Sequence, residues 1–194
     1  DNGTSRTSGS GTWNLATFGD GAATVVDGNS PATTWYTSSQ YLNIYKTDNG
    51  GAWYFSATNG LIDANTGAAP FIGQFTSCPG NPSVLIAGSD NVWRTTDAAG
   101  TWAQNSPDPI DSGSLVVTLA FAPSDRTCGT YAVGTKAGRV FRTNDAGVTW
   151  ADQVPLVLVP LTRLIERVST AGGSTRSVTW SMVPPVAATS AVTA

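Results

Sequence analysis

Short runs of alternating apolar and polar residues recur along this 194-residue chain, and turns rich in glycine, proline, asparagine and aspartate separate them. The run SLVVTLAFAPSD at 114–125 shows the alternation most clearly, and shorter runs follow at 130–135, 138–145 and 149–154. A period of two residues, bounded by turn residues, is typical of β-strands. This region is therefore predicted to form four short strands joined in sequence order.

The same arrangement occurs twice more, and each copy carries an aspartate five residues before a tryptophan. The pairs are Asp48 with Trp53, Asp97 with Trp102, and Asp145 with Trp150. The aspartates are 49 and 48 residues apart, a period typical of propeller blades. The sequence thus predicts an all-β fold: a β-propeller arc of four-stranded antiparallel blades, about three full and one partial, that is not a closed ring on its own.

The aspartate and the tryptophan of each turn are predicted to have structural roles. An aspartate side chain accepts hydrogen bonds from backbone N–H groups two residues on, which closes a turn. The glycine or alanine that follows suits the left-handed conformation of a tight hairpin. The tryptophan then starts the outer strand, and we expect it to fold back over the turn and shield it from water.

The blades are expected at about 18–58, 69–106 and 112–154, after a partial blade at 1–17. Residues 155–194 differ in composition and lack the aspartate–tryptophan turn. Three interpretations of this segment remain open. It could contain a short amphipathic helix that docks on another surface, it could be a disordered tail, or it could result from out-of-frame translation.

The composition argues against several classes of function. Charged residues make up 12% of the chain and the formal net charge is −3, without a basic patch, so no nucleic-acid partner is expected. No apolar run is long enough to cross a membrane, so no membrane partner is expected either. The chain has no histidine and no CxxC pair, which excludes Ser-His-Asp catalysis and argues against zinc. We therefore expect neither a metal nor a cofactor.

The three turns also resemble a known repeat. TNDAGVTW satisfies the pattern S/T-x-D-x-G-x-T-W of the Asp-box (BNR) repeat, TTDAAGTW departs at the glycine, and KTDNGGAW departs at the first position and at the threonine. Residues 1–154 thus resemble the Asp-box β-propellers, which include sialidases, sortilin-type receptors, xyloglucanase-like glycoside hydrolases and photosystem assembly factors. The opening DNGT…GDG is similar to secreted bacterial members. The resemblance implies a fragment of such a protein, with structural Asp-boxes that lie away from the ligand face.

The two cysteines fall at equivalent places in neighbouring repeats. Cys78 ends the inner strand of one unit, and Cys128 lies in the loop after the inner strand of the next. Both should emerge at the same rim of adjacent blades. This placement favours a disulfide and an oxidising compartment, with two free thiols as the alternative.

Four aspartates are candidate ligand-binding residues because of the loops that carry them. Asp20, in FGDG, is expected near the central axis, and Asp63, Asp108 and Asp111 lie in the long connections SATNGLIDANTGAAP and NSPDPIDSGS. Loops held by a rigid scaffold often carry binding residues, so these carboxylates could meet Ca²⁺ or sugar hydroxyls. The alternatives are a turn residue for Asp20 and solvated loop acids for the other three.

Catalysis finds little support among these residues. Glycoside hydrolysis needs two carboxylates at a set separation. In xyloglucanase-like enzymes one of them lies in a loop resembling TDxGGxYR, and GSDNVWR supplies Asp90 without the two glycines or a second matched acid, so an Asx turn is its alternative role. Sialidase chemistry needs an arginine triad, but Arg94 and Arg142 share their repeat position with Lys46, which indicates a structural role.

The predicted function is a binding or scaffold role, with a carbohydrate or protein ligand, in a secreted or cell-surface bacterial protein. The alternative is part of a xyloglucanase-like enzyme, in which case the activity would be that of a glycosidase. An open arc exposes the edge strands and apolar faces of its end blades. The expected partners are therefore the remaining blades of a propeller or further copies of the chain.

Overall fold

The structure, a computed structural model, describes residues 2–153, and the C-terminal segment predicted at 155–194 lies outside the described residues. The N-terminal hairpin contains β1 (Thr4–Thr7) and β2 (Trp13–Thr17). The first blade contains β3 (Thr24–Val26), β4 (Trp35–Ser39), the 3₁₀ turn η1 (Gln40–Leu42), β5 (Asn43–Thr47) and β6 (Phe55–Ser56). The second blade contains β7 (Phe75–Cys78), β8 (Asn81–Gly88), β9 (Val92–Thr95) and β10 (Ala103–Gln104). The third blade contains β11 (Val116–Phe121), β12 (Tyr131–Thr135), β13 (Val140–Thr143) and β14 (Ala151–Gln153).

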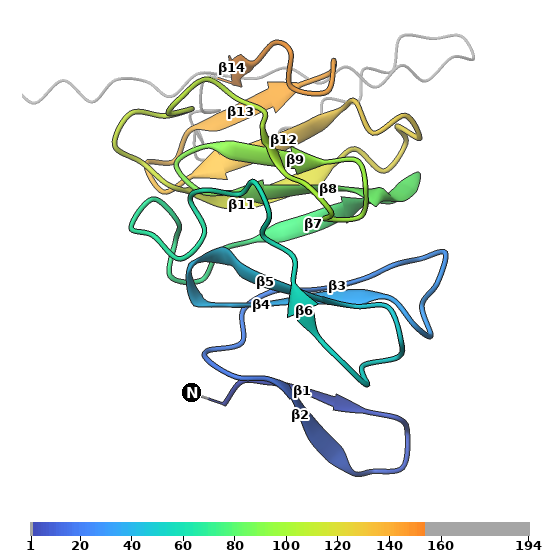
Figure 1. The fold of residues 1–194 in the computed structure, drawn as a ribbon. Helices are drawn as coiled ribbons and strands as arrows, with labels where there is room; N and C mark the ends of the chain where they lie inside the picture. The colour runs from blue at the N-terminus through green and yellow to red at the C-terminus, as the bar shows by residue number, and fades with distance from the viewer. Residues whose placement is uncertain (1, 154–194) are drawn as a thin grey trace, which may run out of the picture. The chain divides into compact units, whose positions relative to one another are not determined.

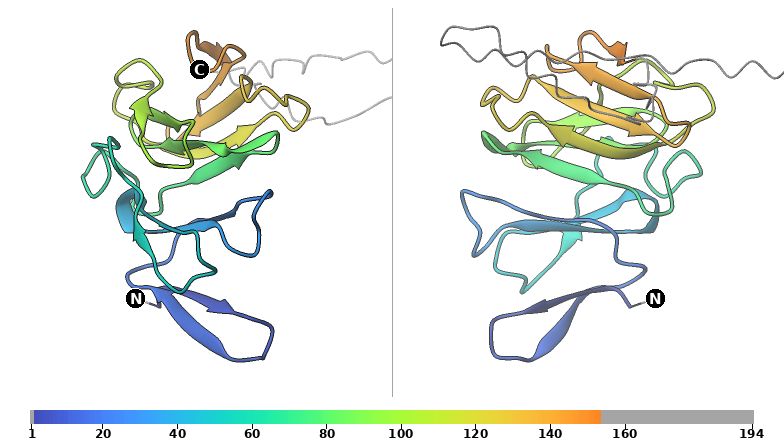
Figure 2. Two further views of the ribbon diagram at one scale, coloured as in Figure 1. Left: turned by 45° about the vertical axis from the view of Figure 1, so that its right-hand side comes forward. Right: turned by 180° about the vertical axis from the view of Figure 1, so that it is seen from behind.

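Each blade is an antiparallel sheet whose four strands pair in chain order, whereas the hairpin is a two-stranded sheet. Within residues 2–153 the hairpin and the three blades follow one another, and the third blade does not return to the hairpin (Figure 1, Figure 2). The prediction of an all-β arc of four-stranded blades that is not a closed ring is confirmed. In the same part of the chain, no helix has the length and apolar character needed to span a bilayer.

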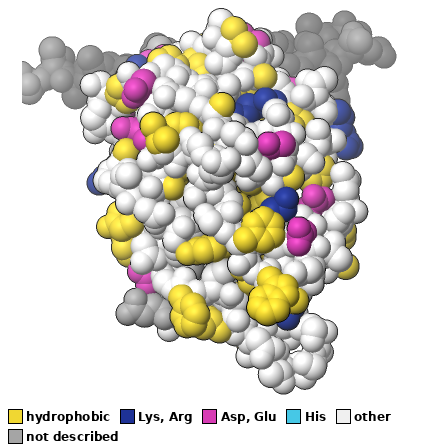
Figure 3. Space-filling view, in the orientation of Figure 1, with side chains coloured by type: hydrophobic (Ala, Val, Ile, Leu, Met, Phe, Trp, Pro, Cys, Tyr) yellow, Lys and Arg dark blue, Asp and Glu magenta, His cyan; other side chains and the backbone are white. Residues whose placement is uncertain are grey.

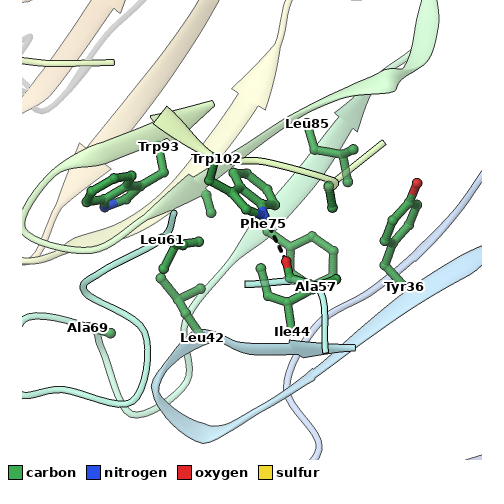
Figure 4. Close-up of a cluster of buried hydrophobic side chains, with 12 residues drawn as sticks. Tyr36, Leu42, Ile44, Ala57, Leu61, Ala69, Phe75, Leu85, Trp93 and Trp102 are labelled. Atoms are coloured by element: carbon green, nitrogen blue, oxygen red, sulfur yellow. Dashed lines mark hydrogen bonds between the residues drawn. The ribbon is translucent and has the colours of Figure 1, made fainter. Parts of the chain in front are cut away.

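The hydrophobic core lies between the blades, because each sheet buries its faces against its neighbours. Tyr36 and Ile44 of the first blade lie opposite Phe75, Leu85 and Trp102 of the second (Figure 4). A second cluster joins the second and third blades and includes Val84, Ile86, Val116, Tyr131, Val133 and Phe141. Burying a large apolar side chain stabilises a protein by about 1.5–3 kcal/mol. Each blade therefore depends on the next for much of its stability.

The connections of the arc alternate between two rims, because successive strands run in opposite directions. We call one the turn rim: it carries the connections from the first to the second strand and from the third to the fourth strand of each blade. Its segments are 8–12, 27–34, 48–54, 79–80, 96–102, 122–130 and 144–150. The connecting rim carries the other loops, including those between blades. Its segments are 18–23, 40–42, 57–74, 89–91, 105–115 and 136–139.

The turns between the third and fourth strands are closed by one side-chain oxygen each. The oxygens are Oδ1 of Asn49, Asp97 and Asp145, and each accepts a hydrogen bond from the threonine hydroxyl two residues earlier, at 2.9, 2.6 and 2.7 Å. Each also accepts the backbone N–H four residues later, at 3.1, 2.9 and 2.9 Å. The threonine bond is the largest cause of a lowered pKa at Asp97, and the bonds from Thr149 and Thr143 lower the pKa of Asp145 to about 2.

The structure moves the first of these turns by one residue from its predicted place. Asn49, not Asp48, is the acceptor, and Tyr54, not Trp53, takes the position of the later tryptophans. Asp48 is exposed, and Trp53 is 76% exposed. The predicted position was one residue too early because Asp and Asn side chains both close such turns and the aromatic residues Trp53 and Tyr54 are adjacent. The threonine at the strand end decides between them.

The two other tryptophans of the motif join neighbouring blades and do more than cover their own turns. Trp102 is 2% exposed, and its Nε1 donates to the carbonyl of Ala57 at 2.8 Å (Figure 4). Trp150 donates in the same way to the carbonyl of Asn105 at 3.0 Å, and its ring meets Tyr131 edge to face at 5.5 Å. Each tryptophan therefore fastens the outer edge of one blade to the chain leaving the preceding blade.

Cys78 and Cys128 form a disulfide on the turn rim, with their Cα atoms 5.7 Å apart. Asp125 shapes the loop that carries Cys128. Its carboxylate accepts the hydroxyl of Thr127 at 2.6 Å and the backbone N–H of Thr130 at 2.7 Å. These hydrogen bonds hold the pKa of Asp125 well below its usual range. The covalent link thus joins the second and third blades at the rim that also carries the Asn and Asp turns.

Candidate binding rim

The connecting rim carries every aspartate that the sequence suggested for binding or catalysis. These residues are Asp20, Asp63, Asp90, Asp108 and Asp111. They come from four separate connections, and all four leave the sheets at the same rim. The meander topology of the blades brings them to one side of the arc.

Asp63 fastens the segment 57–74 to the second blade. Its Oδ2 accepts hydrogen bonds from the hydroxyl of Ser89 at 2.6 Å, the indole of Trp93 at 2.9 Å and the amide of Asn91 at 3.2 Å. Burial raises the pKa of Asp63, but the bonds from Ser89, Trp93, Asn91 and then Asp90 outweigh it and lower the pKa overall. Hydrogen bonds to an ionised acceptor are the stronger ones, so Asp63 acts as a charged anchor.

Asp90 has the opposite electrostatic character. Its Oδ1 accepts a hydrogen bond from Asn91 at 3.0 Å. Partial burial raises its pKa, and the negative charge of Asp63, the hydrogen bond between the two acids and the charge of Asp108 raise it further. Two carboxyl groups whose pKa values are pushed apart take different roles. Here Asp90 keeps its proton to higher pH while Asp63 stays ionised.

Asp111 belongs to an ion-pair network within the third blade. Its Oδ2 accepts the hydroxyl of Thr135 at 2.6 Å, and its Oδ1 contacts Arg139 at 2.7 Å. The hydrogen bond from Thr135 and the guanidinium of Arg139 hold the pKa of Asp111 below its usual range despite the burial of the carboxyl. Arg139 also contacts Asp152 at 2.5 Å and lies 4.7 Å from the ring centre of Phe141. The contacts of Asp111 tie the connection before β11 to the hairpin β12–β13.

Asp20 and Asp108 lie nearer to solvent. Asp20 is half-buried, and its backbone N–H donates to Oε1 of Gln40 at 2.9 Å, which places it beside η1. Asp108 is exposed, and its charge acts on Asp90. The structure therefore places Asp63, Asp90 and Asp108 in one electrostatic group, while Asp111 joins a separate network.

The segment 57–74, which includes most of the predicted ligand-carrying loop at 56–70, contributes to the core between the first two blades. Ala57, Leu61 and Ala69 are buried in the cluster that also contains Trp102. The carbonyl of Ala68 accepts the backbone N–H of Asp90 at 2.8 Å. The segment is thus a packed connection, and only part of it faces solvent.

An exposed aromatic pair on the same rim was not found from the sequence. Tyr41 is 38% exposed and Phe71 is 50% exposed, and their rings meet edge to face with centres 5.3 Å apart. The backbone N–H of Tyr41 donates to the carbonyl of Phe71 at 3.0 Å. Tyr41 and Leu42 both have a φ of 56°, a left-handed conformation that costs a residue other than glycine about 1–2 kcal/mol. The buried Leu42 anchors this turn and holds Tyr41 at the surface.

A signal for that turn exists, although it is weak. Left-handed residues in hairpin turns are usually Asn or Gly, but the three-residue connection Gln40–Leu42 has Tyr41 and Leu42 in that conformation. The pairing with Phe71 leaves no local pattern, because the two residues are in different connections. Space-filling views also show hydrophobic side chains exposed over the first blade (Figure 3).

Asp63 and Asp90 interact directly with each other. Glycosidases hold two carboxyl groups roughly 5–10 Å apart on either side of a sugar. Asp63 and Asp90 instead share the donors Ser89 and Asn91. Within residues 2–153, no group of three metal-ligating side chains could hold a metal ion.

Two surface pockets lie away from these acids. One, of about 320 Å³, lies between the hairpin and the first blade, where Trp13 and Trp35 contribute to its lining. The other, of about 150 Å³, lies at the edge of the third blade, where Arg142, Trp150 and Gln153 contribute to its lining. None of the five aspartates lines either pocket.

Comparisons with known proteins were made at the level of sequence and of structure. No protein-family model and no curated protein sequence matches this chain. An ancestral GH74 enzyme aligns with a TM-score of 0.52 and 19% identity, over 69% of this chain and 18% of that chain. The GH74 xyloglucanase from Xanthomonas campestris aligns with a TM-score of 0.52 and 20% identity, over 73% of this chain and 26% of that chain. YCF48 from Cyanidioschyzon merolae reaches a TM-score of 0.48 at 15% identity, which does not by itself support a shared fold.

The likeness to the two GH74 structures establishes the fold alone. The described residues form a partial β-propeller, consistent with the pairing of strands within each blade. This chain spans only 18% and 26% of the length of those two proteins.

Proposed function

We propose that this chain is part of an Asp-box β-propeller with a binding or scaffold role, and that its connecting rim binds the ligand. The observation that carries the proposal is the aromatic pair Tyr41 and Phe71, which a strained turn holds at the surface. The same rim carries the carboxyl groups of Asp20, Asp63 and Asp90. Exposed rings beside hydrogen-bonding groups suit the apolar faces and hydroxyls of a sugar. A carbohydrate is therefore the ligand favoured here, with a protein ligand as the other outcome.

Two observations on the turn rim support the rest of this assignment. The oxygens of Asp97 and Asp145 close their turns with the same two hydrogen bonds, which supports an Asp-box role. The disulfide between Cys78 and Cys128 supports a secreted or cell-surface bacterial protein, because disulfides persist in oxidising compartments. Remaining blades or further copies of the chain would then cover the ends of the arc.

The binding role is tested by applying the full chain to an array of soluble glycans. The double variant Tyr41→Ala/Phe71→Ala should bind a recognised glycan about tenfold or more weakly, as expected when aromatic contact residues are truncated. Trp53→Ala is the matched control, because it removes an exposed aromatic ring from the turn rim. Failure of the wild type to bind any glycan would reject the carbohydrate ligand, and equal losses in the variants would reject the site.

A second candidate is a contribution to a glycosidase active site. The raised pKa of Asp90 favours it, because a carboxyl group that keeps its proton can act as a general acid. Hydrolysis of xyloglucan or β-glucan by the chain, lost in Asp90→Asn, would support this function. Glycan binding without any turnover would reject it and leave the binding role.

A further inference from the structure

A basic residue occupies the same position in the first strand of the hairpin and in the third strand of each blade. These residues are Arg6 in β1, Lys46 in β5, Arg94 in β9 and Arg142 in β13, and a threonine that ends the strand follows each of them. The hairpin β1–β2 is therefore the equivalent of the outer half of a blade. Its turn at 8–11 corresponds to the Asn and Asp turns of the three blades.

Two of these basic side chains reach the turn of the next blade. Arg6 donates from Nη1 to the carbonyl of Gly50 at 2.5 Å, and Lys46 donates from Nζ to the carbonyl of Ala98 at 3.0 Å. Gly50 and Ala98 each directly follow the Asn or Asp that closes the turn, and both have left-handed backbone conformations. A charged donor makes a stronger hydrogen bond than a neutral one. The same contact thus joins the hairpin to the first blade and the first blade to the second.

A second contact runs in the opposite direction across a junction. Trp102 donates its indole N–H to the carbonyl of Ala57, and Trp150 donates to the carbonyl of Asn105. Ala57 and Asn105 are equivalent positions, one repeat apart, and the next position in the series is Gln153. At the junction of the second and third blades the tryptophan contact is kept, whereas Nε of Arg94 is buried without a hydrogen-bond partner among the described residues.

Each end of the arc formed by residues 2–153 carries the groups for one side of these contacts. At the third blade, Arg142 and Gln153 are exposed and line the pocket of about 150 Å³. At the hairpin, Trp13 stands near the position of Trp102 but is 65% exposed, and the turn at 8–11 is exposed as well. Leu15 is also exposed on β2. Each end therefore offers the groups that the other end lacks.

We infer that these two ends bind each other in a head-to-tail contact between copies of this chain. Arg142 of one copy donates to a carbonyl in the turn at 8–11 of the next copy, and Trp13 of that copy donates to the carbonyl of Gln153. Such a contact is heterologous, because each copy uses two different surfaces, so copies add until a ring closes or a filament grows. No ligand of the connecting rim takes part, so this inference stands or fails independently of the proposed glycan binding.

Sedimentation velocity of the full chain over a concentration series tests the contact. The wild type should form species larger than a monomer. Arg142→Ala and Trp13→Ala should each weaken the association about tenfold or more, the effect expected of central contact residues. Lys136→Ala removes an exposed cation from the connecting rim, and Trp53→Ala removes an exposed indole from the turn rim. Both controls should associate like the wild type, and circular dichroism should show the same fold for all five proteins.

Mixing the two test variants separates a head-to-tail contact from a symmetric one. Arg142→Ala keeps an intact hairpin end, and Trp13→Ala keeps an intact third-blade end. Their mixture should therefore form one complete interface and stop at a dimer with one copy of each variant. The inference is overturned by a wild type that stays monomeric, by test variants that associate like the controls, or by a mixture without the mixed dimer.

Discussion

The two rims of the arc use aspartate in different ways. On the turn rim, Asp97 and Asp145 accept hydrogen bonds from donors no more than four residues away. On the connecting rim, Asp63 binds donors 26 to 30 residues away, and Asp111 binds donors 24 and 28 residues away. The turn-rim acids shape a single hairpin, whereas Asp63 and Asp111 hold separate parts of the chain together. Removing an acid should therefore have local consequences on one rim and distant consequences on the other.

The largest expected effect on stability is that of replacing Trp102, whose indole on the turn rim bonds to Ala57 at the start of the segment 57–74. Trp102→Ala empties a buried site and leaves the carbonyl of Ala57 without its donor. We expect the free energy of unfolding to fall by about 3–5 kcal/mol, as for other large-to-small core substitutions. Urea denaturation followed by circular dichroism measures the loss. Trp53→Ala is the control and should change stability by less than about 0.5 kcal/mol; similar losses in both variants would contradict the role of Trp102 between the blades.

The next effect compares Asp63 with Asp97 directly. Asp63→Ala removes the charged acceptor that Trp93 and Ser89 share, and a hydrogen bond to a charged group contributes about 1.5–3 kcal/mol. Asp97→Ala removes turn bonds at the surface and should cost about 0.5–1.5 kcal/mol. Hydrogen exchange should show lost protection in both 57–74 and 89–93 for the first variant, but only in 95–102 for the second. If Asp63→Ala lost protection from exchange only near residue 63, the proposed difference between the two rims would be contradicted.

A smaller effect tests which residue closes the first turn. Asn49→Ala removes the acceptor for the hydroxyl of Thr47 and the backbone N–H of Trp53. Its cost should be about 1 kcal/mol. Asp48→Ala changes an exposed side chain and should have no measurable effect on the urea midpoint. A larger loss of stability in Asp48→Ala than in Asn49→Ala would instead identify Asp48 as the residue that closes the turn.

The smallest effect, and the one that depends on pH, belongs to Asp90. Because its pKa is raised in the folded protein, the native state holds this proton more tightly than the unfolded state does. Its contribution to stability is therefore present at low pH and is lost as the pH rises from the ordinary carboxyl pKa of about 3.9 through the raised value.

Asp90→Asn removes the charge that forms near Asp63 and Asp108. The variant should be more stable than the wild type at pH 7, by less than about 1 kcal/mol because Asp90 is only partly buried and solvent screens its charge. The difference should disappear near pH 3.5, where the wild-type carboxyl group is protonated as well. Urea denaturation at the two pH values measures this stability difference. A difference of the same size at both pH values would contradict the raised pKa of Asp90.

The candidate site could be predicted only in part. Asp63 and Asp90 could be recognised as loop acids, and the meander predicts that their loops leave the same rim. Their opposed pKa values depend on Ser89, Asn91 and Trp93, which meet Asp63 only after two blades have packed. No local pattern reports such a meeting.

The aromatic pair was missed for the same reason. Tyr41 and Phe71 lie in two different connections, 30 residues apart, and neither has a sequence motif of its own. The one available signal is the use of Tyr41 and Leu42 in a hairpin turn that usually takes Asn or Gly.

By itself, the sequence determined the strands, their order, the turns at Asp97 and Asp145, the first turn to within one residue, and the rim from which each loop leaves. These features depend on alternation, turn chemistry and spacing within a few residues, and a blade repeats them. Only the tertiary structure decided that Trp102 binds the preceding blade, that the pKa of Asp63 is lowered while that of Asp90 is raised, and that Tyr41 meets Phe71. Those contacts join segments 26 or more residues apart, and they depend on the packing of one sheet against the next.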